Sequence, residues 1–149
     1  MGWLVILRAV AGLYWSYFRV QKWFNYAWVR DLMAEASANN PIPIYRELLR
    51  NVIVPNWELI TILQTAAETL VGFSLILGVL SRLSGALGVF MATNLTLGMG
   101  FSFPDFAMVF WYYALALMLD VTVFLGDTGR VFGIDRLILR RFRPSGPFS

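Results

Sequence analysis

The chain has 149 residues, of which 58% are hydrophobic and 14% charged, and its net charge is +3. This composition is too apolar for a soluble domain of this size and indicates a membrane protein. Cysteine and histidine are both absent, which excludes disulfides, haem or iron–sulfur ligation and histidine-based acid–base catalysis by this chain. We therefore expect no metal site. We also expect no nucleic acid partner, because no basic run is interleaved with aromatics outside the apolar segments.

Four apolar stretches are each close to the roughly 20 residues that a helix needs to cross a bilayer. They cover residues 3–24, 57–80, 83–103 and 104–125. Ser81-Arg82 interrupts the sequence between the second and third stretches, which predicts a tight helical hairpin, and Pro104 suits a helix start. We therefore predict an all-α fold, a single domain over residues 1–149 that forms an integral membrane four-helix bundle.

Two amphipathic segments flank these stretches. In the outer connection, residues 26–56, apolar Ile44, Leu48 and Val52 recur every four residues, which predicts a helix that lies on the membrane surface. Such a helix would cover the bundle or dock a partner, and contact with lipid explains the pattern equally well. The C-terminal tail, residues 126–149, predicts a basic amphipathic segment that anionic lipid headgroups attract, with partner docking as the alternative.

Basic residues predict the orientation of the chain. With four spans, both termini and Arg82 lie on one side, which has seven arginines against five basic residues on the other. The positive-inside rule places the side with more arginine in the cytoplasm. We expect a multi-pass protein of a prokaryotic cytoplasmic (inner) membrane with both termini in the cytoplasm.

Glu68 lies at the middle of the second stretch, where an ionisable side chain is costly and is a functional hypothesis by default. Counting about 1.5 Å per residue places Asn94 and Tyr14 at a similar depth, with Gln64 and Arg19 nearer the outer surface. One hypothesis makes Glu68 a catalytic proton donor beside a quinone held by those four residues. The alternative is a polar clasp between Glu68 and Asn94 that only fixes helix packing.

Other polar and aromatic residues near the first span have simpler interpretations. Arg8 and Asp120 share a depth, which predicts a structural ion pair inside the membrane. Lys22 and Arg19 would attract an anionic substrate at the outer face. The aromatic residues between Tyr14 and Trp28 are typical of an interfacial belt, although a flat redox ring would also find stacking surfaces there.

Short motifs along nearly the whole chain resemble the DoxX/DoxD family of four-span membrane proteins. The run Leu7–Leu13 followed by Lys22 is similar to the family's first span, and Glu68 lies within its central signature. The other matching positions are Gly72, Leu77-Gly78, Ser81-Arg82-Leu83, Asn94-Leu95, residues 126–130 and Gly133-Ile134-Asp135. Arg19 departs from the pattern, because relatives have a glycine there; if that glycine admits a ligand, the site is altered or closed in this chain.

The resemblance implies a redox function in a membrane. DoxD with a small partner, DoxA, forms a thiosulfate:quinone oxidoreductase, so the resemblance implies an electron-transport subunit that uses quinone and acts with a partner subunit in the lipid bilayer. Whether this chain is itself an enzyme stays open, because it lacks the residues that sulfur or metal chemistry needs. The alternative is a non-catalytic accessory or assembly subunit of a larger respiratory or photosynthetic membrane complex.

Overall fold

The computed structural model describes residues 2–126 and residue 134, and the regular structure within them is entirely helical. The helices are α1 (Gly2–Phe24), α2 (Trp28–Asn39), α3 (Pro43–Leu48), α4 (Trp57–Leu77), α5 (Ser81–Met99) and α6 (Phe106–Leu125), with a π-helical turn, η1 (Leu49–Ile53), after α3. The predicted all-α fold is therefore confirmed. The predicted amphipathic tail lies outside the described residues, except for Gly126 and Ile134.

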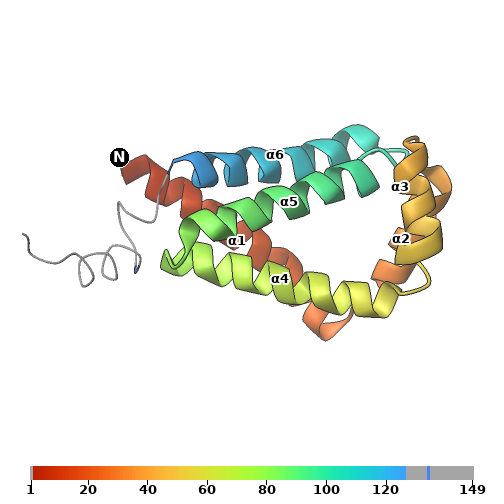
Figure 1. The fold of residues 1–149 in the computed structure, drawn as a ribbon, viewed down its shortest axis with the longest axis horizontal. Coiled ribbons are helices and arrows are strands. Elements are labelled where there is room, and N and C mark those ends of the chain that lie inside the picture. The colour runs from red at the N-terminus through yellow and green to blue at the C-terminus, as the bar shows by residue number, and fades with distance from the viewer. Residues whose placement is uncertain (1, 127–133, 135–149) are drawn as a thin grey trace, which may run out of the picture.

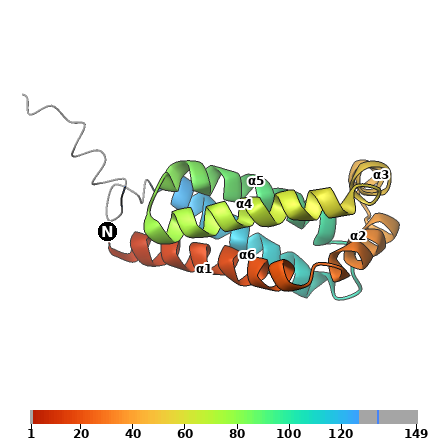
Figure 2. The same ribbon diagram turned by 90° about the horizontal axis from the view of Figure 1, so that it is seen from below.

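Four long helices lie side by side, and α2 and α3 cover one end of them (Figures 1 and 2). The N-terminus, the α4–α5 turn and the end of α6 lie together at the opposite end (Figure 1). Two of the described helices, α4 and α6, are long and apolar enough to cross a membrane. Basic residues in α1 and small polar residues in α5 lower the hydropathy of those two helices, so the four-span interpretation stays a prediction.

A tight turn joins α4 to α5, as Ser81-Arg82 predicted. Helix α4 ends at Leu77, three residues earlier than expected, because Gly78 has a φ of 68° and forms a left-handed C-cap. Leu80 also has a positive φ, 49°, a conformation that costs a non-glycine residue roughly 1–2 kcal/mol. Two left-handed residues reverse the chain quickly, so α5 begins at Ser81 rather than Leu83. It ends at Met99, and a turn leads to α6 at Phe106 rather than Pro104.

The outer connection is largely helical, and it packs onto the end of the bundle. A hydrophobic cluster joins α2 to η1 and α5 through Val29, Met33, Ala36, Leu49 and Met99. Asn40, which is fully buried, donates hydrogen bonds from Nδ2 to the carbonyl oxygens of Leu97 and Gly98 at 2.9 and 2.8 Å. The sequence patterns did not predict α2, whose apolar residues are buried against the ends of other helices.

The apolar residues predicted to form one face of the outer connection are largely exposed. Ile44, Leu48 and Val52 are 73%, 42% and 46% exposed, whereas Leu49 is only 5% exposed and packs inward. In η1 the Val54 amide donates to the Leu49 carbonyl oxygen at 2.8 Å, so the turn contains one residue more than an α-helical turn. The predicted helix thus covers one end of the bundle (Figure 1) although these three apolar side chains are largely exposed, and contact with lipid or a partner stays a prediction.

Close backbone contacts define two helix pairs. Gly12 and Gly72 bring α1 against α4, since a Cβ added to Gly12 would lie 3.0 Å from the Gly72 carbonyl oxygen. Gly88 brings α5 against α6, where an added Cβ would lie 2.6 Å from Cγ of Asp120. Contacts between α1 and α6 and between α4 and α5 are much sparser. The bundle thus consists of two tight pairs, α1–α4 and α5–α6.

Candidate functional site

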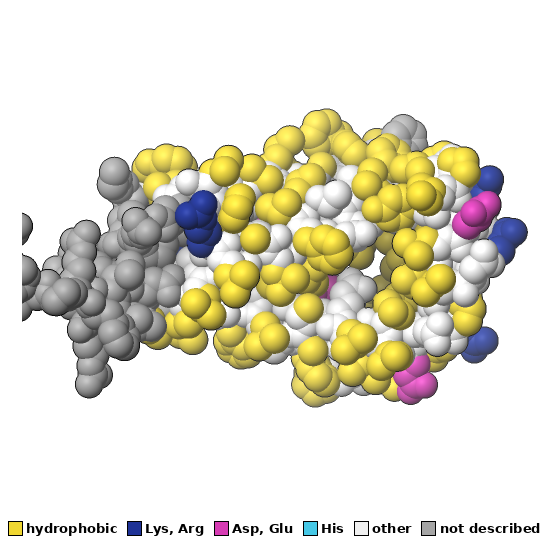
Figure 3. Space-filling model, in the orientation of Figure 1, with side chains coloured by type: hydrophobic (Ala, Val, Ile, Leu, Met, Phe, Trp, Pro, Cys, Tyr) yellow, Lys and Arg dark blue, Asp and Glu magenta, His cyan; other side chains and the backbone are white. Residues whose placement is uncertain are grey.

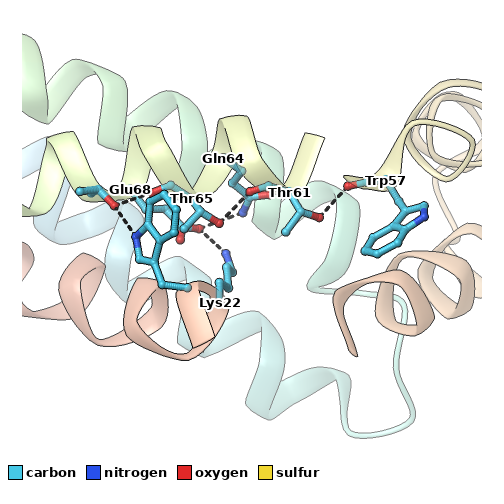
Figure 4. Close-up of polar contacts among 8 residues, drawn as sticks. Lys22, Trp57, Thr61, Gln64, Thr65 and Glu68 are labelled. Carbon is cyan, nitrogen blue, oxygen red and sulfur yellow. Dashed lines mark hydrogen bonds and ion pairs between the residues drawn. The ribbon is translucent and has the colours of Figure 1, made fainter. Parts of the chain in front are cut away.

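A buried ion pair joins the end of α1 to the middle of α4. Nζ of Lys22 lies 2.6 Å from Oε1 of Glu68, and the two side chains are 9% and 2% exposed. The Gln64 amide, one turn earlier on α4, donates a hydrogen bond to the same Oε1 at 2.9 Å (Figure 4). Glu68 therefore has two donors on one carboxylate oxygen, and its partner across the bundle is Lys22.

The other carboxylate oxygen of Glu68, Oε2, is buried and has no hydrogen-bond partner among the described residues. A buried acceptor without a donor is costly, so each such atom in a folded protein calls for an explanation. A ligand or water that donates a hydrogen bond to Oε2 would remove that cost. Glu68 is therefore an acceptor suited to a hydroxyl or amine group.

Polar residues on one side of α4 face the interior of the bundle. Thr61 and Thr65, on the same face as Glu68, are 2% and 3% exposed. Their hydroxyl groups donate to the carbonyl oxygens one turn earlier, at 2.6 Å to Trp57 and 2.7 Å to Thr61 (Figure 4). Since both hydroxyl hydrogens are used within the helix, neither threonine has a hydrogen left to donate to a ligand.

A cavity of about 570 Å³, here called the Glu68 cavity, lies beside this ion pair. Its volume is within the roughly 300–1,000 Å³ range of ligand sites. Its charged and amide side chains are those of Lys22, Gln64, Glu68 and Asp105, and residues from α1, α2, α4, α5 and α6 also line it. The aromatic residues that line it are Tyr14, Trp15, Trp28, Phe103, Tyr112 and Tyr113.

The aromatic side of the cavity includes Tyr14, which sequence reasoning placed near Glu68. The ring of Tyr14 lies 5.6 Å from that of Tyr112 and 5.5 Å from that of Trp15, between centroids. The Tyr14 hydroxyl donates to the Tyr112 carbonyl oxygen at 3.4 Å. Flat aromatic rings favour offset or edge-to-face contacts at these distances, so this wall can accommodate another planar ring.

Two predicted site residues lie elsewhere. Asn94 donates from Nδ2 to the Phe90 carbonyl oxygen at 2.8 Å, and its Oδ1 accepts from the Tyr45 hydroxyl at 3.3 Å. The Arg19 guanidinium lies 4.0 Å from the centroid of the Phe73 ring. Neither Asn94 nor Arg19 is among the described residues that line the Glu68 cavity, and Glu68 pairs with Lys22 instead of Asn94.

A second buried polar contact joins Asp120 of α6 to Trp15 of α1. It is fully buried, and the Trp15 indole N–H donates to its Oδ2 at 3.0 Å and its Oδ1 at 3.3 Å. Arg8, on the same helix as Trp15, is 4% exposed. The hydrogen bonds described for Asp120 come from Trp15, and an ion pair between Arg8 and Asp120 stays a prediction.

Sequence reasoning missed Lys22 as the partner of Glu68, because it placed Lys22 at the outer face. The signal was present in the spacing of α1, where Arg8, Trp15 and Lys22 are seven residues apart. Residues at that spacing share one face of a helix, and all three are buried. Tyr112 and Tyr113 were also missed, since α6 is apolar on all sides and its pattern does not show which face is buried.

The side of the bundle seen in Figure 3 is mostly hydrophobic, and charged side chains gather at the end covered by α2 and α3. At that end the Tyr26 hydroxyl donates to Oε1 of Glu58 at 3.2 Å, and this hydrogen bond raises the pKa of Tyr26. Among the described residues, no group of three or more aspartate or glutamate side chains could hold a metal ion. The polar side-chain groups that line the Glu68 cavity are an amine, an amide, two carboxylates, phenols and indole N–H groups.

Residues 3–145 match a protein-family model, that of DoxD, described as the small subunit of TQO, thiosulfate:quinone oxidoreductase. This match covers nearly all of the chain and includes every residue of the Glu68 cavity named above. No curated protein and no solved structure matches the chain.

Proposed function

The chain belongs to the DoxD family, and from that premise we propose that it is the quinone-binding membrane subunit of a thiosulfate:quinone-type oxidoreductase and acts with a partner subunit. The observation that carries the proposal is the buried Oε2 of Glu68, which has no partner among the described residues although a cavity of about 570 Å³ adjoins its side chain. An ion pair that served only to hold helices together would gain from satisfying that oxygen as well.

The residues of the Glu68 cavity fit a quinone. A quinone ring is flat and apolar on its faces and has carbonyl oxygens that accept hydrogen bonds. The ammonium group of Lys22 and the amide of Gln64 are donors, and Tyr14, Trp15 and Tyr112 offer ring surfaces. When bound, a quinone accepts two electrons and two protons.

The chain's own residues would bind the ring and handle protons. Lys22 would donate a hydrogen bond from Nζ to a ring carbonyl oxygen, and its ion pair with Glu68 keeps the ammonium group at the cavity. Oε2 of Glu68 would accept the hydrogen bond of a ring hydroxyl and hold a proton there. Thiosulfate chemistry would belong to the partner subunit, because this chain has no cysteine or histidine.

The proposal includes four membrane-spanning helices, α1, α4, α5 and α6, with both termini in the cytoplasm. The burial of basic residues supports α1 as a span, since Arg8 is 4% and Lys22 8% exposed. Ionisable side chains within membranes face the bundle interior and pair there. Exposed apolar residues such as Leu70 and Phe90, both 65% exposed, would face the lipid chains.

Quinone binding by the purified chain tests the proposal directly. We expect the wild type to bind a soluble benzoquinone in lipid nanodiscs, and Glu68→Gln and Lys22→Met to weaken that binding at least tenfold. Glu58→Gln is the matched control, because Glu58 is exposed on the same helix and does not line the Glu68 cavity.

Absence of quinone binding by the wild type, or equal binding by Glu68→Gln and Glu58→Gln, refutes the proposal. The accessory-subunit alternative expects a different pattern. In that case no variant changes quinone binding, and substitutions at Lys22 or Glu68 reduce only the assembly of the chain with its partner subunits.

A further inference from the structure

A second cavity, here called the α4–α5 cavity, lies on the other side of α4 and has a volume of about 470 Å³. It occupies the space where α4 and α5 contact each other sparsely, beneath α3 and η1. Figure 3 shows a hollow between α4 and α5 close to α3. Leu63, Leu87 and Phe90 line the cavity and are 57%, 37% and 65% exposed, so they form its rim at the surface of the bundle.

The α4–α5 cavity offers almost no polar group to a ligand. Its polar side chains are Tyr45, Gln64 and Asn94. Tyr45 and Asn94 bond to each other, the Asn94 amide also donates to a backbone carbonyl, and Gln64 donates to Glu68. No described residue that lines this cavity has a buried side-chain polar atom without a partner. These walls suit an apolar chain rather than a polar headgroup.

The two cavities have lining residues in common. Met33, Gln64, Leu95 and Met99 line both of them. Methionine side chains are unbranched and adopt several rotamers with little cost, so two of these four residues can move aside without a change in the backbone. The side chains of these four residues therefore lie between the aromatic Glu68 cavity and the apolar α4–α5 cavity.

We propose that the α4–α5 cavity holds the isoprenoid chain of the quinone whose ring lies in the Glu68 cavity. The chain passes between Met33 and Met99 and leaves the bundle at the rim formed by Leu63, Leu87 and Phe90. This inference rests on the proposed function. It follows from the four residues that line both cavities, from the different polarity of the two cavities, and from the position of Leu63 of the rim on α4, a helix long and apolar enough to cross a membrane.

Filling the α4–α5 cavity tests the inference. Gly98 lines it, and a Cβ added there would meet only Tyr45, at 3.8 Å, so Gly98→Leu places a side chain in the cavity without a backbone clash. Leu63→Trp obstructs the rim from an exposed position, where it does not threaten folding. Leu70→Trp is the matched control, because Leu70 is also exposed on α4, 65% against 57% for Leu63, but does not line the cavity.

Each protein is titrated in nanodiscs with a benzoquinone that has a short isoprenoid chain and with the same ring without a chain. We expect the wild type and Leu70→Trp to prefer the quinone with the chain by roughly tenfold, which corresponds to about 1.4 kcal/mol. Gly98→Leu and Leu63→Trp should abolish this preference and change the affinity for the ring alone less than twofold. Burial of only a few methylene groups provides a preference of that size.

Equal binding of the two quinones by the wild type overturns this inference but leaves the proposed function intact. A preference for the quinone with the chain that survives in both Gly98→Leu and Leu63→Trp also overturns the inference and leaves the proposed function intact. Mass spectrometry of copurified lipid identifies the competing occupant, since loss of a bound phospholipid with unchanged quinone preference assigns the cavity to an acyl chain. Failure of the wild type to bind either quinone refutes the proposed function itself.

Discussion

Variants of the ion pair between Lys22 and Glu68 can distinguish a role in helix packing from a role in ligand binding. Replacing either residue alone, as in Lys22→Met or Glu68→Met, leaves the opposite charge buried without its partner. The double variant Lys22→Met/Glu68→Met replaces both charges with apolar side chains of similar length. We expect each single variant to be strongly destabilised and the double variant to recover most of that loss.

The magnitude follows from the distance and the burial of the pair. At the observed 2.6 Å the attraction between unit charges is about 6 kcal/mol for an effective dielectric constant of about 20. Desolvation of the two ions offsets most of this attraction, so the pair as a whole contributes little. Removal of one partner forfeits the attraction while the other ion stays buried, which costs about 3–5 kcal/mol.

Thermal or denaturant unfolding in detergent, followed by circular dichroism, measures these differences. Quinone binding in the same samples measures the second property, and we expect all three variants to lose it. A double variant as stable as the wild type but unable to bind quinone separates the two roles of the pair. Additive destabilisation in the double variant would refute the reasoning, because it would mean that the two charges do not interact.

Two further predictions concern the packing of α5 and the outer end of the bundle. Gly88→Ala should destabilise the fold by about 1–2 kcal/mol in the same unfolding assay, because the added Cβ would lie 2.6 Å from Cγ of the fully buried Asp120. Tyr26 should titrate above its ordinary pKa of 10.0 by absorbance, because its hydroxyl donates to Glu58. A raised pKa of a phenol favours the neutral form in the folded state, so this contribution to stability is present below about pH 10 and disappears as the pH rises through the raised pKa.

Both predictions have internal controls. An alanine at Gly2 has no atom within 4 Å of its Cβ, so Gly2→Ala should leave the unfolding temperature unchanged. An equally small effect at Gly88 would show that the contact with Asp120 relaxes without cost. Tyr26→Phe identifies which part of the absorbance change comes from Tyr26. Glu58→Gln should lower the pKa of Tyr26, and an unchanged pKa in that variant would contradict the role of the hydrogen bond.

The interior face of α4 could be predicted from sequence because helical periodicity is a local property. Thr61, Thr65 and Glu68 recur at intervals of three and four residues, and this spacing places them on one side of any α-helix. The tight α4–α5 turn was equally local, since Ser81-Arg82 interrupts an otherwise apolar sequence. Predictions of this kind need no knowledge of how one helix lies against another.

The partner of Glu68 was not predictable from depth, because counting from helix centres assumes that neighbouring helices are aligned at their midpoints. The structure instead staggers α1 against α4 through the contact between Gly12 and Gly72. This stagger brings Lys22, near the end of α1, level with the middle of α4. Arg19 fell at the predicted depth of Gln64 but lies over Phe73, since depth alone does not specify the face of a helix.

The buried cations of α1 have a consequence for the synthesis of the protein. Lys22 meets Glu68, which is 46 residues further along the chain, and Trp15 meets Asp120, which is 105 residues further. In the proposed four-span arrangement α1 inserts with these basic residues. A lysine or arginine costs roughly 2.5–3.5 kcal/mol at the centre of an inserting helix on the biological insertion scale and less toward its ends, where Lys22 lies, and α1 leaves the ribosome before Glu68 or Asp120 exists. We therefore expect α1 to remain beside the insertion machinery until α4 arrives, so that membrane integration is a concerted rather than a sequential event.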